Sequence, residues 1–156
     1  KATFFLTGRW TEKFPAVAKE ILDSGMEIGN HGLKHTSPNS MSYEENKADI
    51  EAAAAIIEDT LHVKTVLFAP AAGEIDEQVQ QAATDLDYRL ILWSVDTIDW
   101  QKPKVETIVS RVADQVKDGS IILMHPTENT AAALDGILDV LAEKGYQAVP
   151  VSALIE

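Results

Sequence analysis

The 156-residue chain contains no cysteine, so it has neither a disulfide framework nor a thiol nucleophile. Basic residues are scarce, since 13 Lys and Arg stand against 25 Asp and Glu for a formal charge of −12. We therefore expect no nucleic-acid partner, because phosphate binding needs clustered Lys and Arg. No apolar run approaches the roughly 20 residues of a membrane span, and no signal peptide is visible. The composition, with 46% hydrophobic and 24% charged residues, is ordinary for a globular protein, and with the length it predicts a single domain over residues 1–156.

Much of the acidic charge falls in segments with helical patterns rather than at places where a site is expected. A long helix is predicted from the capping box that begins at Ser42. We interpret its carboxylates as a solvated face. They are Glu44, Glu45, Asp49, Glu51, Glu58 and Asp59.

Short apolar segments alternate with helical segments along the whole chain. The predicted strands are residues 3–7, 26–29, 63–68, 88–93, 121–124 and 146–149. The predicted helices are residues 12–23, 42–61, 76–86, 103–116 and 130–144, with Pro103 in a first turn, Thr130 as an N-cap and a short turn after Ser152. This alternation predicts an α/β fold in which helices cover a parallel sheet, either open or closed into a barrel.

Polar residues follow four of the predicted strands. His31 and His35 come after the second strand, and the loop 69–73 comes after the third. Asp96 and Asp99 follow the fourth strand, and His125 follows the fifth. In folds of this class the chemistry collects beyond the carboxyl ends of the strands, so we expect these residues on one rim.

Each residue also has a structural interpretation, which the sequence leaves open. The two histidines can converge on one ion if the residues between them make a turn, or they can be solvated loop residues. His125 can be a core histidine, and Asp99-Trp100 can be a turn with a packing indole. His62, Trp10 and Trp93 are interpreted as structural.

The chain resembles the polysaccharide deacetylases of carbohydrate esterase family 4, which share the NodB-homology domain. Five ordered segments carry the resemblance: Lys1–Gly8, Gly29–His35, Phe68–Gly73, Trp93–Trp100 and Ile122–His125. In order, they are similar to the family's second conserved strand, its metal-binding histidine motif, its Arg-Pro-Pro-Tyr-Gly loop, its Asp-x-x-Asp-Trp motif and its Leu-x-His motif. The resemblance implies a distorted (β/α) barrel of about six to seven repeats, with the N-terminal strand or strands missing from this chain.

The resemblance also implies metal-assisted hydrolysis of N-acetyl groups in an amino-sugar polymer, either chitin-like or peptidoglycan. His31 and His35 would be metal ligands, with an aspartate as the third. This donor set suits Zn²⁺, while Co²⁺ or Ni²⁺ would also fit. His125 would protonate the departing amine, and Asp99 would orient and charge that imidazole.

The remaining implied roles concern the substrate. The backbone N–H of Ala72 would be the oxyanion donor. Trp100 would form an apolar wall for the sugar ring, Leu123 would line the acetyl pocket, and Pro70 belongs to the loop that contacts substrate.

Two departures from the family pattern limit the expected activity. The first motif, Thr-Phe-Asp-Asp-Gly, which carries the base and the third metal ligand, is absent from the sequence. Ala69 stands where the family has the loop arginine, and Ala72 stands where it has the loop tyrosine. We therefore expect hydrolysis to be weak or absent in this chain. The alternative is a catalytically inactive carbohydrate-binding pseudoenzyme of the cell wall or spore envelope, and a metal-free structural barrel is a third possibility.

The expected partner is an amino-sugar polysaccharide, and the expected location is extracytoplasmic, at the cell surface or spore envelope. An open barrel edge would also allow self-association or pairing with an N-terminal fragment. The sequence does not distinguish chitin fragments from peptidoglycan N-acetylglucosamine or N-acetylmuramic acid, because all carry the same acetamide.

Overall fold

The protein, represented by a computed structural model that describes residues 1–155, forms two compact units. Unit 1 comprises Lys1–Leu92 and the C-terminal segment that begins at Pro150, and unit 2 comprises Trp93–Val149. The single domain expected over residues 1–156 stays a prediction.

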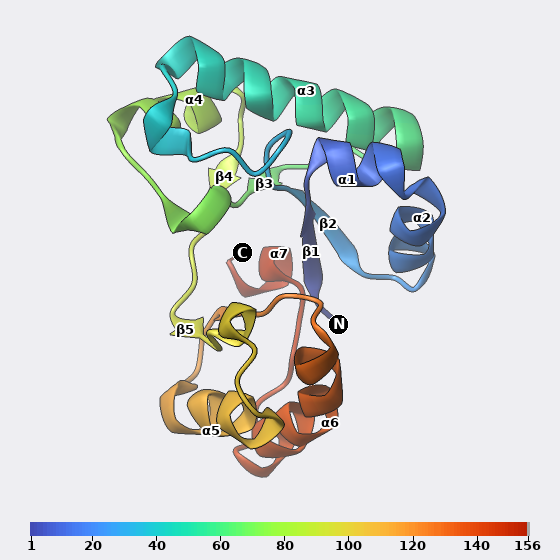
Figure 1. Ribbon diagram of the computed structural model, residues 1–156, viewed down its shortest axis with the longest axis vertical. Coiled ribbons are helices and arrows are strands. Elements are labelled where there is room, and N and C mark those ends of the chain that lie inside the picture. The colour runs from blue at the N-terminus through green and yellow to red at the C-terminus, as the bar shows by residue number, and fades with distance from the viewer. Residues whose placement is uncertain (156) are drawn as a thin grey trace. The chain divides into compact units, whose positions relative to one another are not determined.

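Unit 1 contains a four-stranded parallel sheet (Figure 1). Its strands are β1 (Thr3–Leu6), β2 (Glu27–Asn30), β3 (Leu67–Phe68) and β4 (Arg89–Leu90), and they lie side by side in chain order. The register pairs Leu6 with Asn30 and Asn30 with Phe68, so the carboxyl ends of the first three strands meet at one edge. The predicted α/β fold with parallel strands is confirmed.

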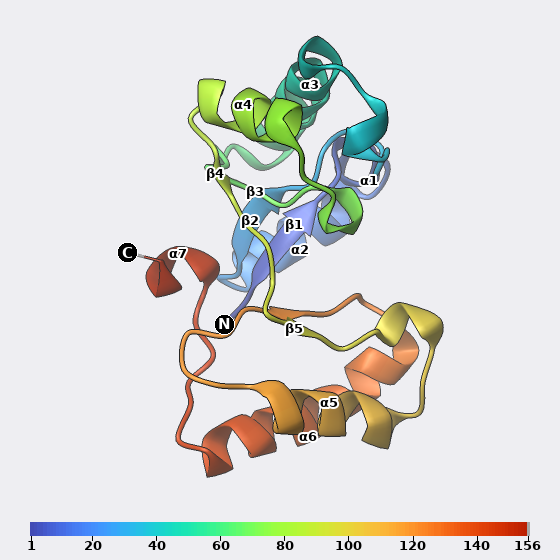
Figure 2. The same cartoon turned by 90° about the vertical axis from the view of Figure 1, so that its left-hand side faces the viewer.

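Four helices accompany this sheet: α1 (Gly8–Lys13), α2 (Pro15–Asp23), α3 (Tyr43–Leu61) and α4 (Glu77–Asp85). The longest, α3, packs against the other three, and all four can be followed in Figure 2. Two short 3₁₀ helices, η1 (Pro38–Ser40) and η2 (Ala71–Gly73), lie in the loops after β2 and β3, and α7 (Val151–Leu154) ends the unit. None of the helices described is both long and apolar enough to cross a membrane.

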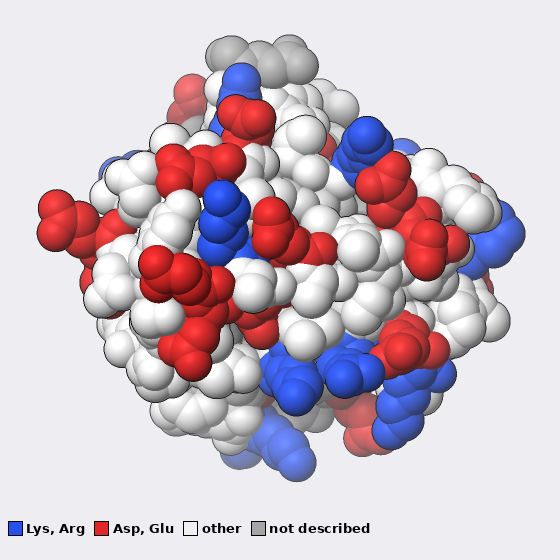
Figure 3. Space-filling view, turned by 90° about the horizontal axis from the view of Figure 1, so that it is seen from above, with Lys and Arg blue, Asp and Glu red and all other residues white. Residues whose placement is uncertain are grey.

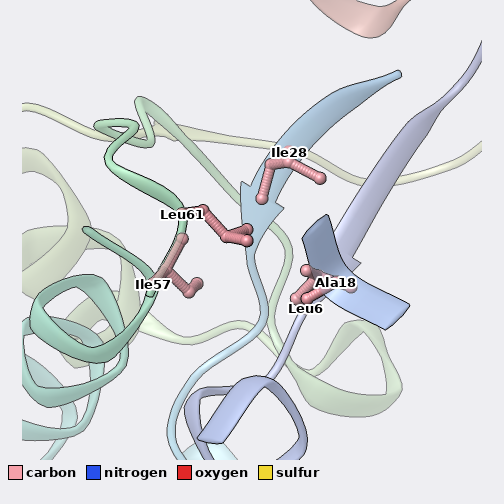
Figure 4. Packing of buried hydrophobic residues seen from close by; sticks show 5 residues of the cluster. All are labelled: Leu6, Ala18, Ile28, Ile57 and Leu61. Carbon is pink, nitrogen blue, oxygen red and sulfur yellow. The ribbon is translucent and has the colours of Figure 1, made fainter. Parts of the chain in front are cut away.

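The core beside β1 and β2 is made of aliphatic side chains from both strands and two helices. Figure 4 shows Leu6 and Ile28 of the strands meeting Ala18 of α2 and Ile57 and Leu61 of α3, and all five are buried. Each of the larger side chains contributes about 1.5–3 kcal/mol by leaving water. This packing fixes the strand ends from which the loops of unit 1 begin.

The predicted capping box of α3 is confirmed, since the Ser42 hydroxyl accepts from Glu45 N and the Glu45 carboxylate accepts from Ser42 N. Asp and Glu side chains outnumber Lys and Arg on the face of the molecule in Figure 3. Such a surface disfavours polyanionic ligands.

Unit 2 consists of a parallel strand pair and two helices. The strands are β5 (Val95–Asp96) and β6 (Ile122–Leu123), with Val95 opposite Ile122. The helices α5 (Val105–Gln115) and α6 (Glu128–Glu143) pack together through a buried cluster of Ile108, Val112, Ala133, Ile137 and Leu141. A short 3₁₀ helix, η3 (Asp99–Gln101), follows β5.

Several predicted element boundaries are wrong. The helix expected over 12–23 is two helices, because Pro15 cannot continue the N–H ladder of α1 and begins α2 instead. No strand forms at 146–149, where Tyr146 N donates back to Leu141 O at the end of α6. Pro103 precedes the N-cap of α5 rather than lying in its first turn. Thr130 is not the N-cap of α6, since Thr127 is.

The C-terminal helix α7 is held to the first two strands by hydrogen bonds around Glu27. Thr3 Oγ1 donates to the Glu27 carboxylate at 2.5 Å and accepts from Val151 N at 2.8 Å, while Ser152 N donates to Glu27 at 3.2 Å. Burial acts to raise the pKa of Glu27, but the hydrogen bonds from Ser152, Thr3 and Val151 outweigh it and lower the pKa below its ordinary value.

Glu27→Gln is expected to destabilise the protein at neutral pH by about 1 kcal/mol, because it removes the charge that these donors solvate. The stability from Glu27 is fully present above its ordinary pKa of 4.5 and is lost as pH falls through the lower folded-state value. Thermal unfolding from pH 3 to 7 checks this: the variant should show a lower Tm at pH 7 and less acid dependence. The matched control is Glu20→Gln at an exposed position of α2. A Tm for Glu27→Gln equal to that of the control at pH 7 would contradict the prediction.

Ala72, within η2, has a backbone conformation that costs energy for any residue with a side chain. Its φ of 55° and ψ of 12° lie in the left-handed region. Ala72→Gly is expected to raise the free energy of unfolding by about 0.5–1 kcal/mol, after the entropy of an added glycine is deducted. Denaturant titration measures the change. Ala71→Gly, next to it but without a positive φ, should destabilise instead. Destabilisation by both variants would contradict the prediction.

Candidate functional site

The histidine pair, His31 and His35, follows the end of β2, where a buried asparagine fixes the chain. Asn30 is fully buried, and its amide donates to Ile50 O at 3.0 Å and to the Tyr88 hydroxyl at 3.2 Å. Its side-chain oxygen accepts from Gly32 N at 2.8 Å. Asn30 therefore connects the start of the histidine loop to α3 and to the residue before β4.

The two imidazole rings of the pair lie edge to face, with centroids 4.9 Å apart and planes at 71°. His31 Nδ1 lies 2.6 Å from the carbonyl oxygen of Ala69. A carbonyl oxygen only accepts, so Nδ1 carries a proton, and in a neutral ring Nε2 would be the nitrogen with the lone pair. His35 has a φ of 60°, a conformation that a non-glycine residue adopts only where the surroundings enforce it.

Residues of α1 and α3 hold the loop between the two histidines. Leu33 N donates to the Asp49 carboxylate at 2.7 Å, and Gly8 N donates to Gly32 O at 3.0 Å. Gly32 has a φ of 75°, and a Cβ there would lie 2.5 Å from Asp49 Oδ2, so only glycine fits. The interpretation of Asp49 as part of a solvated face is therefore wrong. The missed signal is its position next to Ile50, which is buried in α3.

The histidine pair fits two positions of a transition-metal site. A neutral imidazole with its Nδ1 proton bound to a carbonyl is the usual form of a histidine ligand, and such a bond orients the ring. Residues 1–155 contain no group of three or more His, Cys, Asp or Glu that could hold a metal ion. The pair thus supplies two donors, and a tetrahedral site with a substrate position requires a third.

The loop after β3 brings a backbone donor to the surface. Pro70 and Ala69 are buried, while Ala72 is exposed, and its N–H donates to no backbone carbonyl among the described residues. Glu74 accepts a hydrogen bond from Ser37, which connects this loop to the segment after His35. The left-handed turn at Ala72 therefore leaves an N–H open to an acceptor from solution.

The acid–imidazole pair of unit 2, Asp99 and His125, is built around a carboxylate that is 0% exposed. Asp99 Oδ1 accepts from His125 Nδ1 at 2.7 Å. Asp99 Oδ2 accepts from His125 N and from the Thr130 hydroxyl, each at 2.6 Å. Two of these bonds come from the same histidine, so Asp99 fixes both the backbone and the ring of His125.

Burial acts to raise the pKa of Asp99, but the hydrogen bonds from Thr130 and His125 outweigh it and hold the pKa below its ordinary value. Asp99 is therefore ionised at neutral pH and accepts the Nδ1 proton of His125. The His125 side chain is 40% exposed, so this imidazole combines a buried anchor with access to solvent. The arrangement is the acid–imidazole pairing that enzymes use for proton transfer.

The loop that carries Asp99 shows backbone strain. Ile98 has a φ of 51°, which is an outlier for a β-branched residue, and Lys102 has a φ of 54°. Asp96 accepts from Ile98 N at 2.8 Å, and Arg111 donates to Thr97 O at 2.7 Å. Strain of this kind persists only where neighbours over-determine it, and it is often found at functional sites.

The structure brings the sequence-predicted residues together as two pairs, one in each unit. Within unit 2, Trp100 is 57% exposed and Leu123 is partly buried. His62 lies at the C-cap of α3, which agrees with its structural interpretation. Thr130 is a partner of Asp99 that the sequence does not reveal, because a threonine near the start of a helix usually serves as its cap.

Comparisons with known proteins show the family to which the chain belongs. The family profile described as "Polysaccharide deacetylase" matches residues 1–91. The chain is 37% identical to a peptidoglycan-N-acetylglucosamine deacetylase of Bacillus cereus, over 99% of this chain and 75% of that protein. It is 36% identical to the uncharacterised protein YlxY of Bacillus subtilis, over 100% of this chain and 49% of YlxY.

Among solved structures, the chain is similar to a CE4 family pseudoenzyme from Bacillus anthracis. The TM-score is 0.96 and the identity 36%, over 99% of this chain and 55% of that one. A mutant of that pseudoenzyme is described as having restored enzymatic activity. The chain thus spans about half the length of YlxY and of the pseudoenzyme, and three quarters of the Bacillus cereus deacetylase. On the profile match and the identities together, the chain belongs to the polysaccharide deacetylase family.

Proposed function

We propose that this chain acts on the N-acetylated amino sugars of peptidoglycan as a metal-dependent deacetylase of weak activity. The observation that carries the proposal is the acid–imidazole pair, in which a fully buried carboxylate accepts three hydrogen bonds and holds an accessible histidine. A buried ionised carboxylate is costly unless it is fully hydrogen-bonded, and Asp99 uses its hydrogen bonds to orient an accessible imidazole, as proton transfer requires.

Within this proposal His125 Nε2 passes a proton to the amine that leaves when the amide is cleaved. Asp99 keeps a proton on Nδ1 and orients the ring, so that Nε2 is the nitrogen that gives a proton to the leaving amine, which departs poorly without one. The N–H of Ala72 donates to the oxygen that becomes negative as the carbonyl is attacked. Trp100 offers an exposed indole to a sugar ring, Leu123 contacts the acetyl methyl group, and buried Pro70 shapes the loop of Ala72.

The histidine pair would hold a divalent metal, with Zn²⁺ favoured by two imidazoles and Co²⁺ or Ni²⁺ also acceptable. When bound, such an ion lowers the pKa of water and polarises a carbonyl oxygen. In this proposal His31 keeps its Nδ1 proton on Ala69 O and presents Nε2, while the left-handed backbone of His35 turns the second ring toward the first.

The second candidate function is a carbohydrate-binding pseudoenzyme of the cell wall or spore envelope. Ala69 and Ala72 favour it, because both lack the side chains that the resemblance places in that loop. The Bacillus anthracis relative described as a pseudoenzyme supports it as well. Under either function an extracytoplasmic location follows from the position of the polymer. An N-terminal partner fragment or self-association also stays a proposal.

Acetate release distinguishes these functions. With Zn²⁺ or Co²⁺ and acetylated glycan strands, the protein should release acetate far more slowly than the Bacillus cereus deacetylase assayed in parallel. His125→Ala should lower any residual rate about 10²- to 10⁴-fold, since it removes the general acid. His62→Ala is the matched control, with no loss expected. A rate equal to that of the Bacillus cereus enzyme would overturn the proposal of weak activity. No release by any preparation, together with glycan binding that Trp100→Ala weakens, would establish the pseudoenzyme.

Metal binding by the histidine pair is tested without turnover. Calorimetric titration with Zn²⁺ should show one site per chain, and His31→Ala or His35→Ala should each weaken it at least about tenfold, because each removes one donor. His62→Ala should leave the affinity unchanged. Equal affinity in all three variants would show that the pair does not bind the ion and would favour the metal-free structural domain.

A further inference from the structure

Thr130 is placed at the third residue of α6, yet its hydroxyl is not used to cap that helix. The cap bond runs from Thr130 N to Thr127 Oγ1 at 3.1 Å. The Thr130 hydroxyl instead lies 2.6 Å from Asp99 Oδ2, and the residue is only 6% exposed. Helix capping therefore accounts for the backbone of Thr130 and leaves its side chain unexplained.

The direction of the hydrogen bonds follows from the number of protons available. An ionised carboxylate only accepts, so the single proton of the Thr130 hydroxyl points to Asp99. Thr127 Oγ1 and Thr130 Oγ1 are 2.7 Å apart. Because the Thr130 proton is already committed, Thr127 must donate to Thr130. The two hydroxyls thus form a chain in which each bond points toward Asp99 and polarises the next.

We propose that Thr130, aligned by Thr127, is a positioning residue that keeps the Asp99 carboxylate ionised and oriented, so that His125 holds its proton on Nδ1 and exchanges protons through Nε2. The assignment of a chemical task to Nε2 rests on the proposed function. The hydroxyl chain itself does not, because it acts on Asp99 whether or not the protein turns over substrate.

Other charged groups on the surrounding elements do not replace this role. Asp96 and Lys102 flank η3, Arg111 lies on α5, and Glu128 begins α6. Arg111 is engaged with Thr97 O and Asp96 with Ile98 N. Within residues 1–155, His125 is the only basic side chain that lies within ion-pair distance of Asp99. The remaining stabilisation of this buried charge comes from neutral donors, of which Thr130 supplies the only side-chain hydroxyl.

Thr130→Val tests the proposal, because valine keeps the backbone N–H that binds Thr127 and the branched shape while it removes the hydroxyl. Carboxyl-carbon NMR should show the pKa of Asp99 higher in this variant than in the wild type. Imidazole-nitrogen NMR should show a larger fraction of His125 with its proton on Nε2. Thr130→Ser should restore both values. The matched control is Thr11→Val, which removes another buried threonine hydroxyl, one that donates to Thr7 O.

Thr127→Ala provides a second variant should Thr130→Val fold poorly. This variant keeps the hydrogen bond from Thr130 to Asp99 but removes the Thr127 hydroxyl that donates to Thr130. The pKa of Asp99 should therefore rise by less than in Thr130→Val. An unchanged Asp99 titration in either folded variant would overturn the proposal and reduce Thr130 to a packing residue. A shifted titration in a protein that releases no acetate would uphold the proposal while the deacetylase function fails.

Discussion

A polar side chain can be buried only where it finds hydrogen-bond partners. The histidine loop after β2 and the loop of Asp99 both depend on this constraint. An unpaired buried polar group costs about 1–3 kcal/mol. No buried side-chain nitrogen or oxygen within residues 1–155 lacks a partner. Asn30 satisfies this constraint by fixing the start of the histidine loop, and Asp99 satisfies it by fixing His125. The hydrogen bonds that satisfy the buried Asn30 and Asp99 side chains are thus the same bonds that position the histidine loop and His125.

Much of the fold could be predicted from the sequence because local patterns agree with it. The capping box at Ser42 and the alternation of apolar segments with helices reflect short-range physics that a single chain displays directly. The helix boundaries that were predicted wrongly depend on contacts with other parts of the chain. Thr127 and Thr130 are both residues that can cap a helix, and in the structure Thr127 caps α6 while the Thr130 hydroxyl binds Asp99, which is distant in sequence. The role of Asp49 likewise depends on Gly32, which comes from another segment.

The site residues divide into those whose chemistry is visible in the sequence and those whose contribution is geometric. His31, His35, Asp99 and His125 could be singled out by residue type and by position after strands. Thr130 and Asp49 could not, because hydroxyls and carboxylates near helix starts are common. The left-handed backbone of Ala72 was also not predictable, since alanine rarely adopts it. The two alanines of this loop therefore bring no polar side chain to it, and its contribution lies in the left-handed backbone of Ala72.

The hydrogen bonds of Glu27 and Thr3 with α7 have a consequence for how the chain can be made. Residues 93–149 form an insertion, since unit 1 begins at the N-terminal end of the chain and is completed by α7. During synthesis, β1 and β2 emerge well before the segment that satisfies Thr3 and Glu27. Unit 1 must therefore wait for the whole of unit 2 to be translated before its last contacts form.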